Sequence, residues 1–291
     1  MAGIFGFFDF TKPGKGVDPD EPEKRAVFRY LDILWQKKGK LIALNFFYFV
    51  CILPIILAFY LFLYEPFMTR LLGEELLVGT LFVAMFAFIF SLPPPVLILL
   101  MAVSVFLLGP VTCGLTYVLR NFVRREHAWV SDFWQRAKMN FKQGLFLGIV
   151  DALMFYVGFF NITLFFDPVY EVPTFFAVGA IVVFIIFLCM RNTLYLMAVT
   201  VELTNFQLLR NAFLLTFDGL WRHLLTGFIY TIYIVLILLI NPYVELFVLP
   251  LLGFSLLGFT SVFICYPLVH KRLILPHLER AAESGEDGDD Q

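Results

Sequence analysis

Long uncharged stretches alternate with short charged ones along this chain. The longest uncharged runs cover residues 41–64, 76–119, 223–244 and 246–269. Each run is at least as long as the ~20 residues that a helix needs to cross the ~30 Å hydrocarbon layer of a bilayer. The pattern therefore predicts an all-α fold, a polytopic bundle of transmembrane helices.

Six full spans are predicted from these runs and from the apolar segments between them. They lie at 41–63, 96–119, 143–166, 174–199, 223–241 and 246–267. Amphipathic helices are predicted at 23–40, 131–143 and 204–217, each before a pair of spans and each on the cytoplasmic side. Asp132 with Gln135, and Thr204 with Gln207, have the spacing of capping pairs at the start of the second and third of these helices.

Residues 76–95 do not fit a simple span. As one helix, residues 76–119 would extend ~66 Å, about twice the hydrocarbon thickness. Pro93, Pro94 and Pro95 must interrupt that helix. Two full spans here would place Arg120, Arg124 and Arg125 outside the cell, against the positive-inside rule. We therefore predict that 76–92 is a partial, re-entrant or interfacial element.

The remaining segments frame the membrane domain. Residues 1–26 are polar and rich in proline, which predicts an extended cytoplasmic lead-in. Residues 27–278 form the transmembrane domain, and 279–291 form an acidic tail that we expect to be disordered.

The basic residues predict the orientation of the chain. All of the 21 lysines and arginines except Arg70 and Arg191 lie in 1–40, 120–142, 200–222 or 271–280. The spans put these four segments on one side, which the positive-inside rule makes the cytoplasm. Both termini are then cytoplasmic, in the plasma membrane of a bacterium. The four tryptophans map to the same boundary, where indole rings anchor membrane proteins.

Composition offers no sign of catalysis. The chain is 60% hydrophobic and only 15% charged, with four cysteines that never form a CxxC motif. The four histidines are scattered through predicted cytoplasmic segments without metal-ligand spacing, and we expect them on the surface. No phosphate-binding loop or nucleophile motif occurs either. We expect no enzyme activity, no cofactor and no metal.

Asp151 and Arg191 are the two charges that lie well inside apolar sequence. Charged side chains within a membrane cost several kcal/mol, about 3 or more, unless they are paired or hydrated. Both residues lie ~12–13 Å from the cytoplasmic ends of their spans at the helical rise. Adjacent antiparallel helices would then bring them together, and Asn161 and Asn192 complete a candidate intramembrane polar site. Alternatively, Arg191 extends to the headgroups and Asp151 lies at a hydrated boundary.

A second candidate site is the basic block between the second and third spans. Its members are Arg120, Arg124, Arg125, Arg136, Lys138 and Lys142. Near a membrane surface each cation contributes ~1 kcal/mol to the binding of anionic lipid. The block also suits a cytoplasmic partner, or it serves only to set topology. We expect no nucleic acid partner, because no soluble domain carries the patch.

The order of several motifs resembles the YesL-like family of bacterial integral membrane proteins, which carry a domain of unknown function. The matching segments are Phe5 to Val17 (FGFFDFTKPGKGV), Lys40 to Asn45 (KLIALN), Leu53-Pro54, Gly109-Pro110, Leu115 to Arg124 (LTYVLRNFVR), Asp132-Phe133 and Asn140 to Gly144 (NFKQG). Compared with that family, residues 64–108 resemble an insertion. The resemblance implies a setting beside carbohydrate-uptake genes of Gram-positive bacteria, and it implies no established activity.

Three functions remain open from sequence. The first is a non-enzymatic accessory or assembly component associated with carbohydrate uptake, in contact with a sugar-transport complex. The second is a small-solute transporter that uses the polar site at Asp151 and Arg191. The third is a membrane-embedded enzyme acting on lipid or glycan. A transporter needs a water-filled cavity lined by the polar groups, whereas an accessory protein needs a packed core and a free outer surface.

Overall fold

The computed structural model describes residues 25–59, 93–166, 173–240, 248–276 and 278–279. Within these ranges 91% of the residues are helical and none is in a strand, which confirms the all-α fold. The chain divides into two compact units, Met1–Gln36 and Lys37–Gln291. Most of the predicted lead-in and tail, and the predicted partial element at 76–92, lie outside the described residues.

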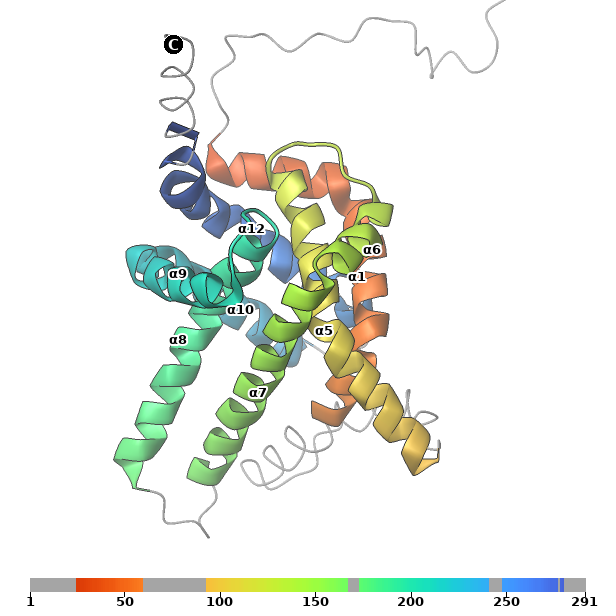
Figure 1. Cartoon of the computed structure of the whole chain (residues 1–291), viewed down its shortest axis with the longest axis vertical. Coiled ribbons are helices and arrows are strands. Elements are labelled where there is room, and N and C mark those ends of the chain that lie inside the picture. The colour runs from red at the N-terminus through yellow and green to blue at the C-terminus, as the bar shows by residue number, and fades with distance from the viewer. Residues whose placement is uncertain (1–24, 60–92, 167–172, 241–247, 277, 280–291) are drawn as a thin grey trace, which may run out of the picture. The chain divides into compact units, whose positions relative to one another are not determined.

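The helices follow one another in the order that Figure 1 shows. They are α1 (Ala26–Phe59), α5 (Pro94–Val123), α6 (Val130–Met139), α7 (Phe141–Phe166), α8 (Thr174–Ala198), α9 (Asn205–Asp218), α10 (Leu220–Ile240), η3 (Leu249–Gly253), α12 (Phe254–Val269) and η4 (His270–Ile274). The two elements η3 and η4 are π-helical and continue α12 at its two ends.

Five helical segments of the described chain are long and apolar enough to cross a membrane, so the protein is multi-pass. They are Ala26–Ile56, Ile98–Val123, Phe141–Phe165, Thr174–Ala198 and Leu249–Ile274. These match five of the six predicted spans. The other, predicted at 223–241, coincides with the 21-residue helix α10, which is not among the five. That crossing stays a prediction.

The first helix differs from the prediction. An interfacial helix was expected to end at the lysines of residues 37–40 and a separate span to begin at 41. Instead α1 is one continuous helix of 34 residues. Lysine is a good helix former, so a basic cluster at the membrane surface does not interrupt the backbone hydrogen bonds.

The two later amphipathic helices are present, and they are capped differently. Before α9, the Thr204 side chain accepts a hydrogen bond from the Gln207 N–H, and the Gln207 side chain accepts one from the Thr204 N–H, as predicted. The predicted Asp132–Gln135 cap is wrong. Helix α6 begins earlier, and the Asp132 carboxylate accepts a hydrogen bond from the backbone N–H of Trp129 at 2.9 Å.

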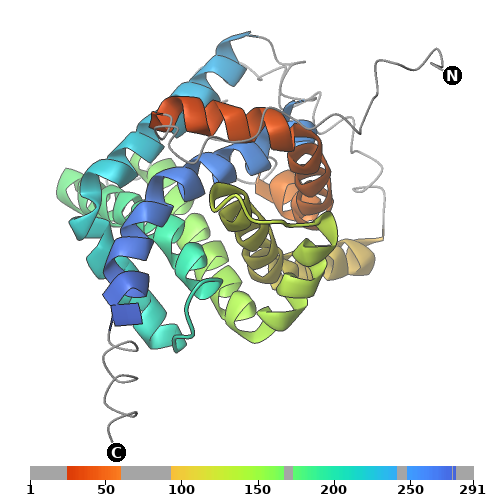
Figure 2. The ribbon, with the colours of Figure 1, turned by 90° about the horizontal axis from the view of Figure 1, so that it is seen from above.

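Helix α5 contacts α6, α7, α8 and α12. Figure 2 shows its C-terminal half, in olive, next to α12 in blue and to α6 and α7 in yellow-green. At Gly109 the backbones of α5 and α7 touch. A Cβ atom added there would lie 1.7 Å from the Gly144 carbonyl oxygen and 2.6 Å from the Gly148 nitrogen. Small residues at this spacing permit close helix approach in membranes.

Asn45 joins the first span to the last one. Its side chain is fully buried, donates a hydrogen bond to the Leu249 carbonyl at 2.8 Å and accepts one from the Ser255 N–H at 2.8 Å. Both groups lie at the edges of the π-helical turn η3, where the regular backbone pattern is interrupted. Asn45 therefore supplies hydrogen bonds that a lipid environment does not offer.

We predict that Gly109→Ala destabilises the protein by about 3 kcal/mol or more, because the added methyl group has to separate two helix backbones. Thermal unfolding in mild detergent measures the effect. Gly179→Ala is the matched control, since a Cβ at Gly179 meets nothing within 4 Å. Alanine is the better helix former, so this control should unfold at the same or a higher temperature. Equal behaviour of the two variants would contradict the close contact.

Candidate intramembrane polar site

Asp151 and Arg191 form an ion pair between the facing helices α7 and α8. The Arg191 Nε atom donates a hydrogen bond to Asp151 Oδ2 at 2.8 Å. Helices α7 and α8 lie side by side in Figure 1. Because they run antiparallel, Asp151 and Arg191 lie at a similar depth on the two helices. The structure therefore confirms the pairing expected from depth.

The carboxylate of Asp151 is shared by two donors and closed off from the surface. The Tyr195 hydroxyl donates a second hydrogen bond to Oδ2 at 2.8 Å, from one turn further along α8. Asp151 is 0% exposed. Its other oxygen, Oδ1, has no hydrogen-bond partner among the described residues. Asp151 is thus a buried carboxylate, and its Oδ1 atom can still accept a hydrogen bond.

Two further helices complete the polar cluster. The Tyr48 hydroxyl of α1 and the Thr112 hydroxyl of α5 lie 3.0 Å apart, and Thr112 also donates to the Leu108 carbonyl. Tyr48 is close enough to the Arg191 guanidinium to interact with it. The cluster, defined here as Tyr48, Thr112, Asp151, Arg191 and Tyr195, therefore joins α1, α5, α7 and α8.

Arg191 is the outermost charged member of this cluster. Its side chain is 27% exposed, while that of its partner is not exposed at all. The guanidinium carbon lies 5.8 Å from the Phe155 ring centroid and 5.2 Å from that of Tyr195. Aromatic rings attract a guanidinium electrostatically, more strongly when water is excluded. The pair and the rings together hold the charge inside the span.

The two predicted asparagines do not join the pair. Asn161 donates to the Val157 carbonyl on its own helix at 2.8 Å. It lies ten residues beyond Asp151, or ~15 Å along α7 at the helical rise. Asn192 accepts a hydrogen bond from the Ser261 hydroxyl of α12 at 3.0 Å and therefore packs toward a different neighbour. The predicted four-residue site thus reduces to its charged pair.

The basic block separates into a structural arginine and an outer surface. Arg120 is only 7% exposed, which removes it from the candidate patch. Its guanidinium donates to the Val199 carbonyl at 2.6 Å and to Asn121 Oδ1, so it satisfies the C-terminal end of α8. Two arginines contact the Tyr117 ring. The guanidinium carbon of Arg120 lies 4.6 Å from the ring centroid, and that of Arg136 lies 4.2 Å from it.

The other basic side chains remain near the surface. Arg124 pairs with Glu126 at 2.6 Å, and Arg125, Lys138 and Lys142 are exposed. Arg125 has a φ of 59°, the left-handed conformation of the residue after a helix end. The Glu126 N–H bonds the Asn121 carbonyl and the Arg125 N–H bonds the Phe122 carbonyl. This Schellman motif turns the chain sharply after α5 and presents the arginines outward.

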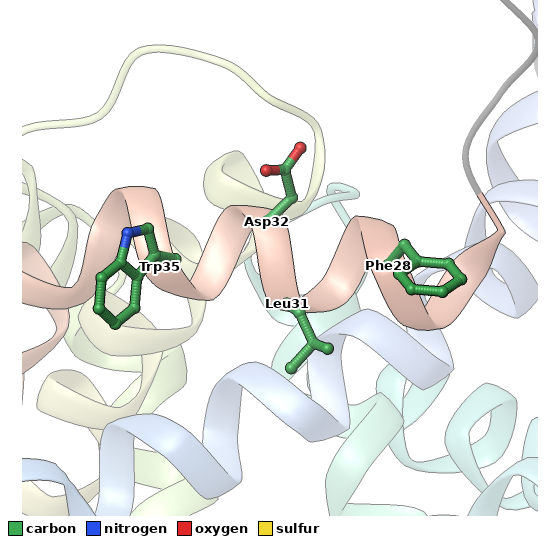
Figure 3. Close-up of a pocket in the computed structure, with 4 residues that line it drawn as sticks. All are labelled: Phe28, Leu31, Asp32 and Trp35. Carbon is green, nitrogen blue, oxygen red and sulfur yellow. The ribbon is translucent and has the colours of Figure 1, made fainter.

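An open groove lies on the N-terminal part of α1, within the unit Met1–Gln36. Figure 3 shows its lining residues Phe28, Leu31, Asp32 and Trp35, with Asp32 pointing to the opposite side from Leu31 and Trp35. The three apolar side chains are exposed. Their spacing of three to four residues makes one apolar stripe, as expected of an amphipathic helix at a membrane surface.

One histidine departs from the expectation that all four lie on the surface. His223 is buried in α10, with Nδ1 3.9 Å from the Cys265 sulfur and no partner for Nε2 among the described residues. It lies at the start of a long apolar run and packs against Cys265 of α12. In the described part of the chain, no group of three His, Cys, Asp or Glu side chains could hold a metal ion.

Comparison with known proteins finds a family model that matches part of the chain. Residues 41–162 match the family model described as "Protein of unknown function, DUF624". This match confirms the YesL-like resemblance. It includes Asp151 and the basic block and ends before Arg191. No curated protein and no solved structure matches the chain.

We predict that Asp151→Ala and Arg191→Ala each destabilise the protein by about 3–5 kcal/mol, because each leaves a buried charge without its partner. The exchanged pair, with Asp151→Arg and Arg191→Asp combined, should recover part of this loss. Thermal unfolding of these variants and of the double alanine variant in detergent measures the coupling. Tyr195→Phe is a milder control, because the ion pair remains. Additive effects of the two alanine substitutions would contradict a pair that acts as a unit.

Proposed function

We propose that this chain, which carries the DUF624 family segment at residues 41–162, is a non-enzymatic accessory or assembly component of a membrane complex. The observation that carries the proposal is that the polar groups inside the spans bind one another. Asp151 is fully buried and accepts hydrogen bonds from Arg191 and Tyr195. Tyr48 interacts with Arg191 and lies within hydrogen-bond distance of Thr112. Such a cluster fixes the positions of helices, which is the requirement for a docking scaffold.

The packing of the core supports the same proposal. Backbone contact at Gly109 and Gly144 leaves no space for a side chain between α5 and α7. A solute pathway would have to lie elsewhere among the described helices. In contrast, large apolar side chains are exposed on α9, including Phe206 and Phe217, and basic ones are exposed after α5. These outer surfaces suit contacts with lipid and with other proteins.

The setting of the proposed complex follows from the resemblance and from the charges. The YesL-like resemblance favours a bacterial plasma membrane and a sugar-uptake system. The basic segments favour a cytoplasmic position for both termini and for α6 and α9. Exposed Arg125, Lys138 and Lys142 are then placed to bind anionic lipids or a cytoplasmic subunit.

A small-solute transporter is the second candidate, and one observation favours it. The Asp151 Oδ1 atom has no partner among the described residues, and unsatisfied buried acceptors are uncommon in proteins. A hydroxyl group of a solute would satisfy it in a state that opens the cluster. If the protein is a transporter, the purified chain should take up solute when it is reconstituted alone into lipid vesicles.

We predict that affinity purification of the full chain from its native membrane, under mild detergent, recovers a permease or ATPase subunit in each repeat. Gly109→Ala provides the control, because a disrupted bundle should lose the partner. Recovery of the monomer alone, together with solute uptake by that monomer, would overturn the accessory role and establish the transporter.

We further predict the sidedness of the basic surface. In a variant without the four native cysteines, Arg124→Cys should resist a membrane-impermeant maleimide in intact cells and react after permeabilisation. Thr174→Cys is the opposite control, because it begins α8 at the far end of the span and is exposed. Labelling of Arg124→Cys from outside intact cells would reverse the proposed orientation.

A further inference from the structure

Among the five helices that are long and apolar enough to cross a membrane, α7 and α8 are the least buried. Within the most apolar window of each helix, 22% of the residues of α7 and 17% of those of α8 are buried. The corresponding shares are 44% for α5 and 50% for the segment that contains α12. Lipid chains readily cover apolar side chains such as Val178 and Ile185, so this exposure alone specifies no partner.

Arg191 distinguishes this surface from an ordinary lipid-facing one. It lies seven residues before the end of α8, or ~10 Å from that end at the helical rise. A free arginine at this depth extends to the headgroups. Here the hydrogen bond from Nε to the buried Asp151 holds the guanidinium inside the span, although the side chain is 27% exposed.

The guanidinium retains hydrogen-bonding capacity. An arginine has five N–H donors. Among the described residues, we find one hydrogen bond from Arg191, through Nε, and an interaction with the Tyr48 hydroxyl. Leaving a hydrogen-bond donor unsatisfied in the hydrocarbon region is energetically costly. The exposed Nη groups therefore need an acceptor from outside the described chain.

We propose that Arg191 is an intramembrane recognition point for a transmembrane helix of a partner protein, which presents a neutral hydrogen-bond acceptor to the Nη groups. The inference rests on the proposed accessory function and specifies how the partner is held. A partner helix that docks against α7 and α8 would cover their exposed apolar side chains. The same helix would accept hydrogen bonds from the Arg191 Nη groups. Interhelical hydrogen bonds of this kind contribute to the association of helices in membranes.

The acceptor is neutral because the charge of Arg191 is already balanced by Asp151. A second carboxylate would bring an uncompensated negative charge into a medium of low dielectric constant, at a cost that exceeds the gain. Asn, Gln, Ser and Thr side chains provide an acceptor without this penalty.

A second copy of this chain does not supply the acceptor through its own surface asparagine. Asn161 lies twenty residues after the start of α7, or ~30 Å from that end, whereas Arg191 lies ~10 Å from the adjoining end of α8. A parallel copy in the same membrane would place the two groups ~20 Å apart in depth. The surface asparagine of a second copy therefore lies too far away in depth to be the acceptor.

The test uses a photo-crosslinking amino acid in the full chain, in its native membrane. Leu188 is exposed on α8 one turn before Arg191, and Val182 is exposed on the opposite side of the helix. We expect one membrane protein to crosslink from position 188 and not from 182. Arg191→Lys keeps the charge and shortens the donor, so it should reduce the yield about tenfold.

Further variants make the result decisive. Leu188→Trp blocks the surface without touching the ion pair and should displace the partner, while Val182→Trp should not; these two replace Arg191→Lys if that variant fails to fold. The crosslinked partner should carry Asn, Gln, Ser or Thr within its span at the depth of Arg191. Adducts with phospholipid only, a carboxylate at that depth, or a yield unchanged by Arg191→Lys and Leu188→Trp would overturn the inference. Copurification that persists in these variants would leave the accessory function intact.

Discussion

The direct contact between the backbones of α5 and α7 is the constraint on which the rest of the bundle depends. At Gly109, Gly144 and Gly148 no side chain separates the two helices. About one helical turn after Gly109, α5 carries Thr112 and Cys113. The close approach of the two helices brings this part of α5 near Asp151 on α7. A wider separation would leave Asp151 facing lipid, where an ionised carboxylate is costly. The glycines therefore determine whether the membrane interior of this protein can hold a charge.

The charge in turn organises the remaining spans. Asp151 receives hydrogen bonds from two residues of α8, Arg191 and Tyr195, and the Tyr48 hydroxyl brings α1 to the same point. In water such contacts contribute little, because each group exchanges one hydrogen bond for another. Inside a bilayer the alternative is an unsatisfied group, so the contacts specify which helices are neighbours even where their net contribution is modest. The main contribution of this cluster is to specify which helices pack against one another, more than to stabilise the bundle.

Sequence analysis could find the charged pair and not its surroundings. Asp151 and Arg191 stand out because charges are rare in apolar segments, and counting residues from the span ends gave matching depths. Tyr48, Thr112 and Tyr195 are residue types that occur in most spans, so no pattern marks them before the helices are placed. The burial of Arg120 could not be predicted either. Its acceptor is the backbone carbonyl of Val199, and every residue has a backbone carbonyl, so no sequence pattern marks this one. Asn161 and Asn192 were included by type alone, and geometry assigns them other neighbours.

The link between Asn45 and the residues around η3 has a consequence for biosynthesis. Asn45 lies in the first span, and its acceptor Leu249 emerges from the ribosome 204 residues later. At about 5–20 residues per second, the carboxamide waits about 10–40 s inside the membrane before its native contact exists. During that interval the carboxamide lacks this partner. A chain that stops before the last span never completes the contact, so its Asn45 side chain keeps an unmet hydrogen-bond requirement within the membrane.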